Sequence, residues 1–155
     1  MPLFTVPGSW VEAQTITTFA TNRTGSTLAI GNVCSFDLTG SDGDVDAYAT
    51  TPNDPFANII IPATAHLEGW LFCLALEATA NDKQGKFLVR GIGLCLTTGI
   101  AISESLMCAN GVHSAAKRTD GNVSIGIALT AGSSAATTKV LFEGWALTTA
   151  GSASL

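Results

Sequence analysis

Charged side chains are scarce in this sequence. Asp, Glu, Lys and Arg make up 12% of its 155 residues, about half of the usual share of roughly 25%. The net charge is −5, and the seven basic residues are scattered, without a Lys/Arg cluster or interleaved aromatic residues. A nucleic-acid-binding surface needs clustered positive charge to displace counterions from phosphates. The composition therefore disfavours a nucleic-acid partner. It suits either a β domain coated with Thr and Ser or a chain that buries much of its surface against copies or partners.

Long hydrophobic runs are absent as well. No segment approaches the ~18 consecutive apolar residues of a membrane span, and Met1 to Thr5 lack the basic and apolar regions of a signal peptide. We therefore expect no membrane partner, and synthesis in the cytoplasm with reduced cysteines. The four cysteines stand alone without a Cys-x-x-Cys pair, which argues against a zinc or redox site. Cys73 and Cys95 lie in apolar runs and are expected in the core.

Recognisable catalytic motifs are missing. The two histidines, His66 and His113, belong to no nucleophile elbow, phosphate loop or zinc-protease motif. The simplest interpretation is a surface pair with Glu68 for His66 and a solvent-exposed turn for His113. Residues 42–46 carry alternating aspartates, but an EF-hand requires glycine where Ala47 stands, so a solvated acidic loop is favoured over a calcium site. We expect no catalytic residues, no metal and no cofactor, and hence no enzyme.

One sequence pattern occurs twice. Residues 69–78 return as 122–131 and residues 86–94 return as 139–147, both at an offset of 53 positions and without a gap. Over the whole span, residues 69–94 against 122–147, seven of the 26 aligned pairs are identical, and several others exchange one apolar residue for another. A fixed offset indicates one supersecondary unit that is used twice in a larger core. The repeat positions that we expect in the core are Trp70, Leu76, Gly91, Ile127, Leu129 and Gly144.

Alternation of side-chain size indicates strands in both copies. In residues 70–76 the bulky side chains share one face, while Cys73 and Ala75 lie on the other, which should meet another surface closely. No helical apolar period persists beyond about two turns. We predict an all-β fold of two related small β units, barrel-like or sandwich-like, with an extended N-terminal arm.

The expected organisation has three parts. Residues 1–22 form the arm, residues 23–97 the first β unit with an excursion loop at 38–62, and residues 98–155 the second β unit with a C-terminal tail. The arm either packs on its own domain or lies on a neighbouring subunit. Its partner-binding candidates are Phe4, Trp10 and Phe19, because aromatic anchors dominate interface energetics.

Residues 98–147 contain an ordered series of packing motifs. An apolar strand is followed by Asn110-Gly, a polar stretch with Asp120-Gly, an Ile-Gly-Ile-Ala strand starting at Ile125, a loop rich in Ala and Gly, and a Val-rich strand. This series resembles the small β domains of tailed-phage capsid decoration proteins, which are also called head cement or stabilisation proteins. Through the repeat, the resemblance also covers residues 24–94, except for the 38–62 loop, which departs from the family pattern. Residues 1–22 are not covered.

The resemblance implies a structural protein on the capsid surface of a bacteriophage virion. Such a protein binds the major capsid protein from outside, often as a homotrimer, and stabilises the shell without catalytic residues. One alternative is a jelly-roll shell or spike subunit. Another is a carbohydrate-binding β module with Trp70 or Trp145 exposed, although the repeat aligns Trp70 with Val123, and apolar exchange indicates burial more than ligand stacking.

Overall fold

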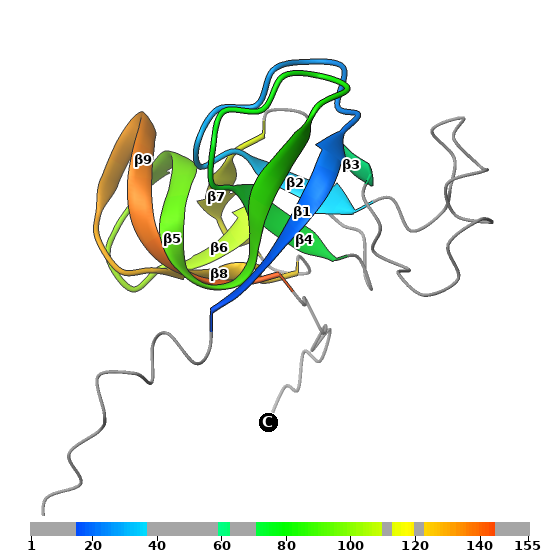
Figure 1. The fold of residues 1–155 in the computed structure, drawn as a ribbon. Helices are drawn as coiled ribbons and strands as arrows, with labels where there is room; N and C mark the ends of the chain where they lie inside the picture. Colours follow the sequence, from blue (N-terminus) through cyan, green and yellow to red (C-terminus); the bar gives the residue numbers. More distant parts are fainter. Residues whose placement is uncertain (1–14, 37–58, 63–70, 110–112, 120–122, 145–155) are drawn as a thin grey trace, which may run out of the picture.

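The computed structural model describes residues 15–36, 59–62, 71–109, 113–119 and 123–144, and within these ranges every regular element is a β-strand (Figure 1). In chain order the strands are β1 (Ile16–Asn22), β2 (Val33–Phe36), β3 (Ile59–Pro62), β4 (Phe72–Ala75), β5 (Gln84–Ile100), β6 (Ser105–Cys108), β7 (Ala115–Lys117), β8 (Gly126–Ala128) and β9 (Gly132–Glu143). The all-β prediction is confirmed. The described ranges contain no helix that could cross a membrane.

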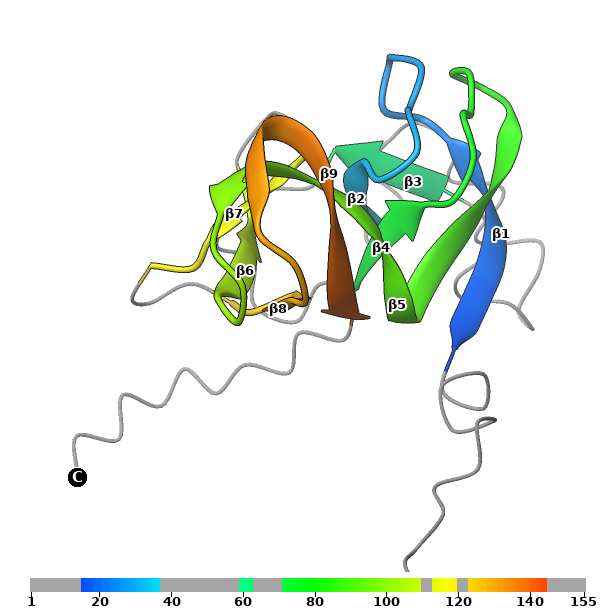
Figure 2. The same cartoon turned by 90° about the vertical axis from the view of Figure 1, so that its left-hand side faces the viewer.

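The strands form one hydrogen-bonded sheet that closes on itself twice. Its order is β1-β3-β2-β4-β5-β7-β6-β8-β9, with further pairings of β5 to β1 and to β9. The first pairing closes a ring of β1, β3, β2, β4 and the first half of β5. The second closes a ring of the second half of β5 with β7, β6, β8 and β9. The chain therefore forms two five-stranded barrels, here called the first and the second barrel, which lie side by side and share β5 (Figure 2).

The two barrels have the same connectivity. Each ring contains one parallel pair, β1 with β3 or β5 with β7. The other four pairs of each ring are antiparallel. Taken in chain order, β1 to β5 correspond one to one with β5 to β9, so β5 is the last strand of one barrel and the first strand of the other. The duplication thus extends well beyond the two blocks that are visible in the sequence.

The hydrophobic core runs through both barrels. The interior of the first barrel consists of Ala20, Leu28, Cys34, Phe36, Leu71, Cys73, Ala75, Phe87 and Val89. A second cluster joins the interior of the second barrel, with Val140 and Phe142, to outward-facing residues of the first barrel, among them Leu74 and Leu88. The small-residue face of β4 therefore meets the interior of its own barrel, where Phe36 and Phe87 occupy the space, and its bulky face meets the other barrel.

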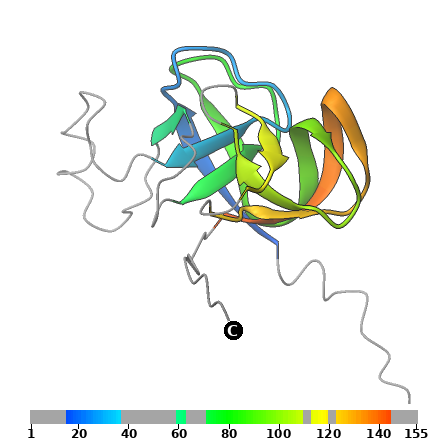
Figure 3. The ribbon, with the colours of Figure 1, turned by 180° about the vertical axis from the view of Figure 1, so that it is seen from behind.

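Two glycines allow β5 to belong to both rings. At Gly93 an added Cβ would lie 2.7 Å from Leu88 Cδ2, because the Leu88 side chain lies against the backbone of its own strand. Gly91 has a φ of +129°, and an added Cβ would lie 2.9 Å from Thr15 Oγ1. Side chains at these positions would collide with their neighbours, so glycine permits the close contacts of this strongly curved strand. Figure 3 shows the two barrels from the opposite side.

The structure divides the chain differently from the sequence expectation. Residues 16–22, expected in the arm, form β1 and pair with β5 and β3, so they are a wall of the first barrel. The boundary expected between residues 97 and 98 falls inside β5, which both barrels share. The end of the expected 38–62 loop is β3, while residues 1–14 and 37–58 lie outside the described part.

A threonine and a glycine exchange places between the two barrels. In the first barrel, a Cβ on Gly85 would lie 2.0 Å from Thr79 Oγ1. At the two matching positions of the second barrel the residues are reversed, and a Cβ on Gly132 would lie 1.9 Å from Thr138 Oγ1. Each barrel therefore has room for one threonine side chain at this place, which comes from the earlier of the two positions in the first barrel and from the later one in the second.

We predict that G85T alone destabilises the protein by about 1–3 kcal/mol, because the new side chain overlaps Thr79. The double variant T79G/G85T reproduces the arrangement of the second barrel and should recover most of that loss. Urea unfolding of wild type, both single variants and the double variant measures the coupling. If the double variant is as unstable as the sum of the two single variants, the two residues do not share this space.

Candidate interaction surface

One cysteine and one histidine approach each other where the barrels meet. Cys34 Sγ lies 4.0 Å from His113 Nδ1, and the His113 carbonyl accepts a hydrogen bond from Val33 N at 2.8 Å. Burial raises the pKa of Cys34 far above its ordinary value, and neighbouring Cys108 adds to the shift. Because only a thiolate is an effective nucleophile, this pair is not an activated catalytic site. His113, expected in a surface turn, is partly buried and joins the two barrels.

The other three cysteines are also buried away from solvent. All four are free and buried, as expected for Cys73 and Cys95. Burial raises the pKa of Cys73 well above its ordinary value, and raises that of Cys95 and that of Cys108 to about 12 each. At neutral pH these residues are protonated apolar core groups.

Metal binding has no support in the described ranges. They contain no group of three or more His, Cys, Asp or Glu side chains that could hold an ion. The acidic stretch at residues 42–46 and His66 lie outside the described part of the chain.

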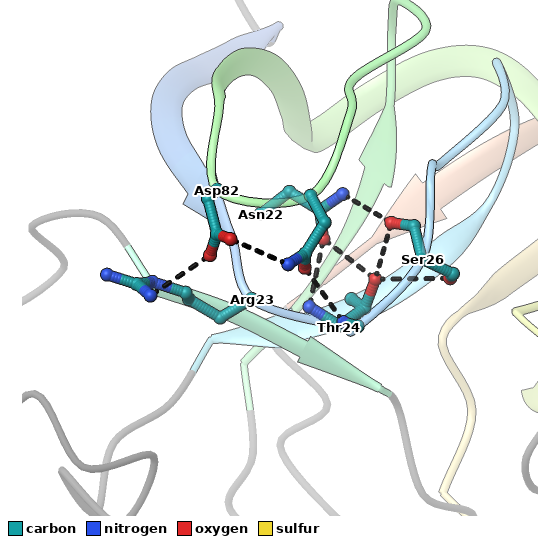
Figure 4. A network of polar contacts seen from close by, with 7 residues as sticks. Asn22, Arg23, Thr24, Ser26 and Asp82 are labelled. Carbon is teal, nitrogen blue, oxygen red and sulfur yellow. Dashed lines mark hydrogen bonds and ion pairs between the residues drawn. The ribbon is translucent and has the colours of Figure 1, made fainter.

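A network of polar contacts surrounds Asn22, at the end of β1 (Figure 4). Its Nδ2 donates to the carbonyls of Ser26 and Thr79 at 2.8 and 2.9 Å, and its Oδ1 accepts from Thr24 N and Oγ1 at 2.9 and 2.7 Å. Arg23 and Asp82 form an ion pair at 3.0 Å beside this network. Because the amide is fully buried and its hydrogens are used, Asn22 ties two loops together instead of presenting a modification site.

A row of apolar side chains lies on the outer surface of the second barrel. Ile127 pairs with Leu141, which in turn pairs with Ile92, so the three lie side by side across β8, β9 and β5. They are 44%, 38% and 36% exposed, respectively. We call these residues the outer row. Arg90 and Glu143, which occupy matching repeat positions, form an exposed ion pair of 3.3 Å beside it, worth less than about 1 kcal/mol.

A second apolar site lies on β1. Phe19, one of the predicted partner-binding residues, is 57% exposed, and Ile16 on the same strand is also exposed. Phe4 and Trp10 lie outside the described residues. Exposed large apolar groups that gather on one strand are typical of interaction sites.

The expected core positions of the repeat have different environments. Gly91 and Gly144 are buried, and Leu76 and Leu129 are partly buried, whereas Trp70 lies outside the described residues. Ile127 was expected in the core and instead faces outward. Its repeat partner Leu74 is buried because the second barrel covers it, and no described element covers Ile127 in the same way. Local alternation could not reveal this difference.

Comparison with known proteins supports the fold. No protein-family model matches the sequence, and no curated protein matches it. Five chains among solved structures match, including the head fiber gp8.5 N base in bacteriophage phi29. That match has a TM-score of 0.55 at 10% sequence identity and covers 86% of this chain and 98% of the other. At this level of identity the likeness is one of architecture.

We predict that none of the four cysteines reacts with a thiol reagent within minutes at pH 8 in the folded protein, and that all four react in urea. Burial both blocks access and keeps the thiols protonated. Counting the modified residues by mass spectrometry checks the result. Rapid labelling of any cysteine in the folded state would contradict the described packing.

We also predict that N22D lowers the free energy of unfolding by about 2–4 kcal/mol, since it places an acceptor against two carbonyls and buries a charge. S26A is the matched control, because its hydroxyl forms only an exposed 3.4 Å contact with Thr24 Oγ1. S26A should unfold at nearly the wild-type urea concentration. An equally stable N22D would show that the amide network contributes little.

Proposed function

We propose that this protein is a structural component of a bacteriophage virion that binds the outside of the assembled capsid and stabilises it. It acts as a homo-oligomer, with a trimer as the expected form, and its partner is the major capsid protein. The observation that carries the proposal is the architectural likeness to the head fiber gp8.5 N base in bacteriophage phi29, which extends over 98% of that chain. Independently, motif order in residues 98–147 resembles capsid decoration proteins.

The surface chemistry agrees with a binding role. A protein that covers many identical capsid sites needs shape and apolar contact and has little need of a reactive group. The exposed apolar groups on β1 and in the outer row provide such contact. The cysteines are buried thiols, and the Cys34–His113 pair is not activated.

A second candidate is the base of a fiber or spike on the phage head. The matched solved structure favours this candidate, since it is the base of a head fiber. A decoration protein is expected to occupy all equivalent lattice sites, whereas a fiber base is expected at a subset of them. Counting bound copies per capsid separates the two. The jelly-roll form of this alternative does not fit, because the described strands close into two five-stranded barrels.

The carbohydrate-binding alternative has no support in the described part of the chain. All three tryptophans, at positions 10, 70 and 145, lie outside it. A glycan titration followed by tryptophan fluorescence tests that alternative directly.

The protein should sediment with undecorated capsids of its own phage and raise the temperature at which those capsids lose their DNA. Removing residues 1–14 should weaken binding by about tenfold or more if the arm supplies aromatic anchors. The deletion must end before β1, because residues 16–22 form a wall of the first barrel.

An unchanged melting temperature of the deleted protein is the control for folding. Binding that is equally strong without residues 1–14 would assign the contact to the barrels. Absence of the intact protein from the capsid pellet would contradict the proposed function.

A further inference from the structure

The outer row lies in a regular array of outward-facing side chains on the second barrel. On β9, Lys139 and Glu143 stand two residues before and two residues after Leu141, and the three share one face of the strand, since the residues between them are buried. The outer row crosses β9 at Leu141, with Ile92 on the β5 side and Ile127 on the β8 side. This face therefore carries a cation, an apolar row and a carboxylate in that order along β9.

The apolar character of the outer face of β9 is confined to the outer row. Strands with one face in water carry polar or small residues on that face. The exposed positions nearer the start of β9 follow this rule, with Ser133, Ala135 and Thr137. Leu141 departs from it, and its neighbours on both adjoining strands are apolar and exposed as well. The outer row thus has the composition of a contact surface.

The charges beside the outer row are mainly positive. Arg90 and Glu143 already form an ion pair with each other. Lys139, on the other side of the row, forms no ion pair with any residue of the described ranges. Glu143 is the one acidic residue within β5, β8 and β9. A complementary partner therefore brings a carboxylate to Lys139.

A second copy of the same face has a carboxylate at the required place. Two copies that face each other about a two-fold axis can be aligned in two ways. If the axis runs along β9, Lys139 lies opposite Lys139 of the second copy, and Glu143 lies opposite Glu143. If the axis runs along the outer row, the two β9 strands are antiparallel, and Lys139 of each copy lies opposite Glu143 of the other. Because like charges that face each other are unfavourable, the charge pattern selects the second alignment.

The apolar groups match in that alignment as well. The outer row lies along the axis, so each of its side chains faces the same side chain of the second copy. Leu94, which is 47% exposed and pairs with Lys139, lies opposite Arg90 of the second copy. The aliphatic stem of an arginine can cover such an apolar group while its charge stays in water. Glu143 then lies between Arg90 of its own chain and Lys139 of the second copy.

We propose that the outer row of one copy of this protein docks on the outer row of a second copy about a two-fold axis. The contact is isologous, because both copies use the same surface patch. This inference goes beyond the proposed function, since the contact needs no capsid and a trimer would have to use another surface. The patch is smaller than the roughly 1,200 Å² of a stable interface, so association is reversible and weak, with a Kd on the order of 100 μM.

The test is the mass of the purified full-length protein without capsids, measured by analytical ultracentrifugation from about 10 μM to about 1 mM. The mass of wild type should double across this range. I127D/L141D should keep the lower mass, because it places carboxylates on the axis. I102D is the matched control, because Ile102 is 63% exposed in the turn after β5 and lies outside the outer row. It should associate like wild type.

Exchanging the charges tests the alignment. K139E and E143K should each associate about fivefold or more weakly than wild type, because each brings like charges to face each other twice in the pair. A mixture of the two variants should regain association, since one copy then presents carboxylates at both positions and the other presents ammonium groups. If the axis ran along β9, neither single variant would be weaker than wild type.

Three results would overturn the proposal. They are a wild type no heavier than I127D/L141D, single charge variants that associate as strongly as wild type, or a mixture that does not regain association. The milder I127T/L141T variant replaces I127D/L141D if the latter melts below wild type.

The outcome is independent of the proposed function. If wild type does not pair but sediments with capsids, the outer row is free for the capsid, and the proposed function stands without this contact. If wild type pairs as described but ignores capsids, the contact stands and the proposed function fails.

Discussion

The whole structure depends on one strand that two barrels share. β5 closes the first ring through β1 and opens the second through β9, so neither barrel can be completed without it. Sharing a strand requires close approach between segments of the same chain, and the absence of side chains at Gly91 and Gly93 permits that approach. As a result the outer face of the first barrel becomes part of the core of the second. The barrels therefore share a strand and part of one hydrophobic core, although each repeats the connectivity of the other.

The duplicated barrels have diverged in two physically different ways. Inside, changes compensate each other. Thr79 with Gly85 in one barrel becomes Gly132 with Thr138 in the other, and the filled volume is retained. Outside, the same row of positions remains apolar while its surroundings differ, since Leu74 and Leu88 are covered and Ile127 and Leu141 are exposed. Close packing limits which side chains fit in the interior of each barrel. The outward row is different, because the second barrel covers it on the first barrel, whereas on the second barrel it is exposed.

The likeness to the phage head fiber base is also one of architecture. At 10% identity over most of both chains, the retained property is the arrangement of strands. Few specific residues are needed for such an arrangement, because alternation, glycines at close contacts and small residues beneath large ones suffice. The cysteine, histidine and asparagine side chains that could have indicated a reactive site have structural roles in the described part of the chain. The cysteines fill core space, and His113 and Asn22 use their polar atoms to connect loops and barrels.

The sequence by itself determined the all-β class, the duplication and the core positions of Cys73 and Cys95, because alternation and self-similarity are local properties of the chain. It placed β1 in an arm and Ile127 in the core, and it set a domain boundary inside β5. Those three features depend on which strands pair and on which face each barrel turns to the other. A period of two shows that faces alternate, but not which face is inside. Only closure of the rings decided that Leu74 is covered while its repeat partner Ile127 is exposed, since pairing between distant strands is not encoded in either strand alone.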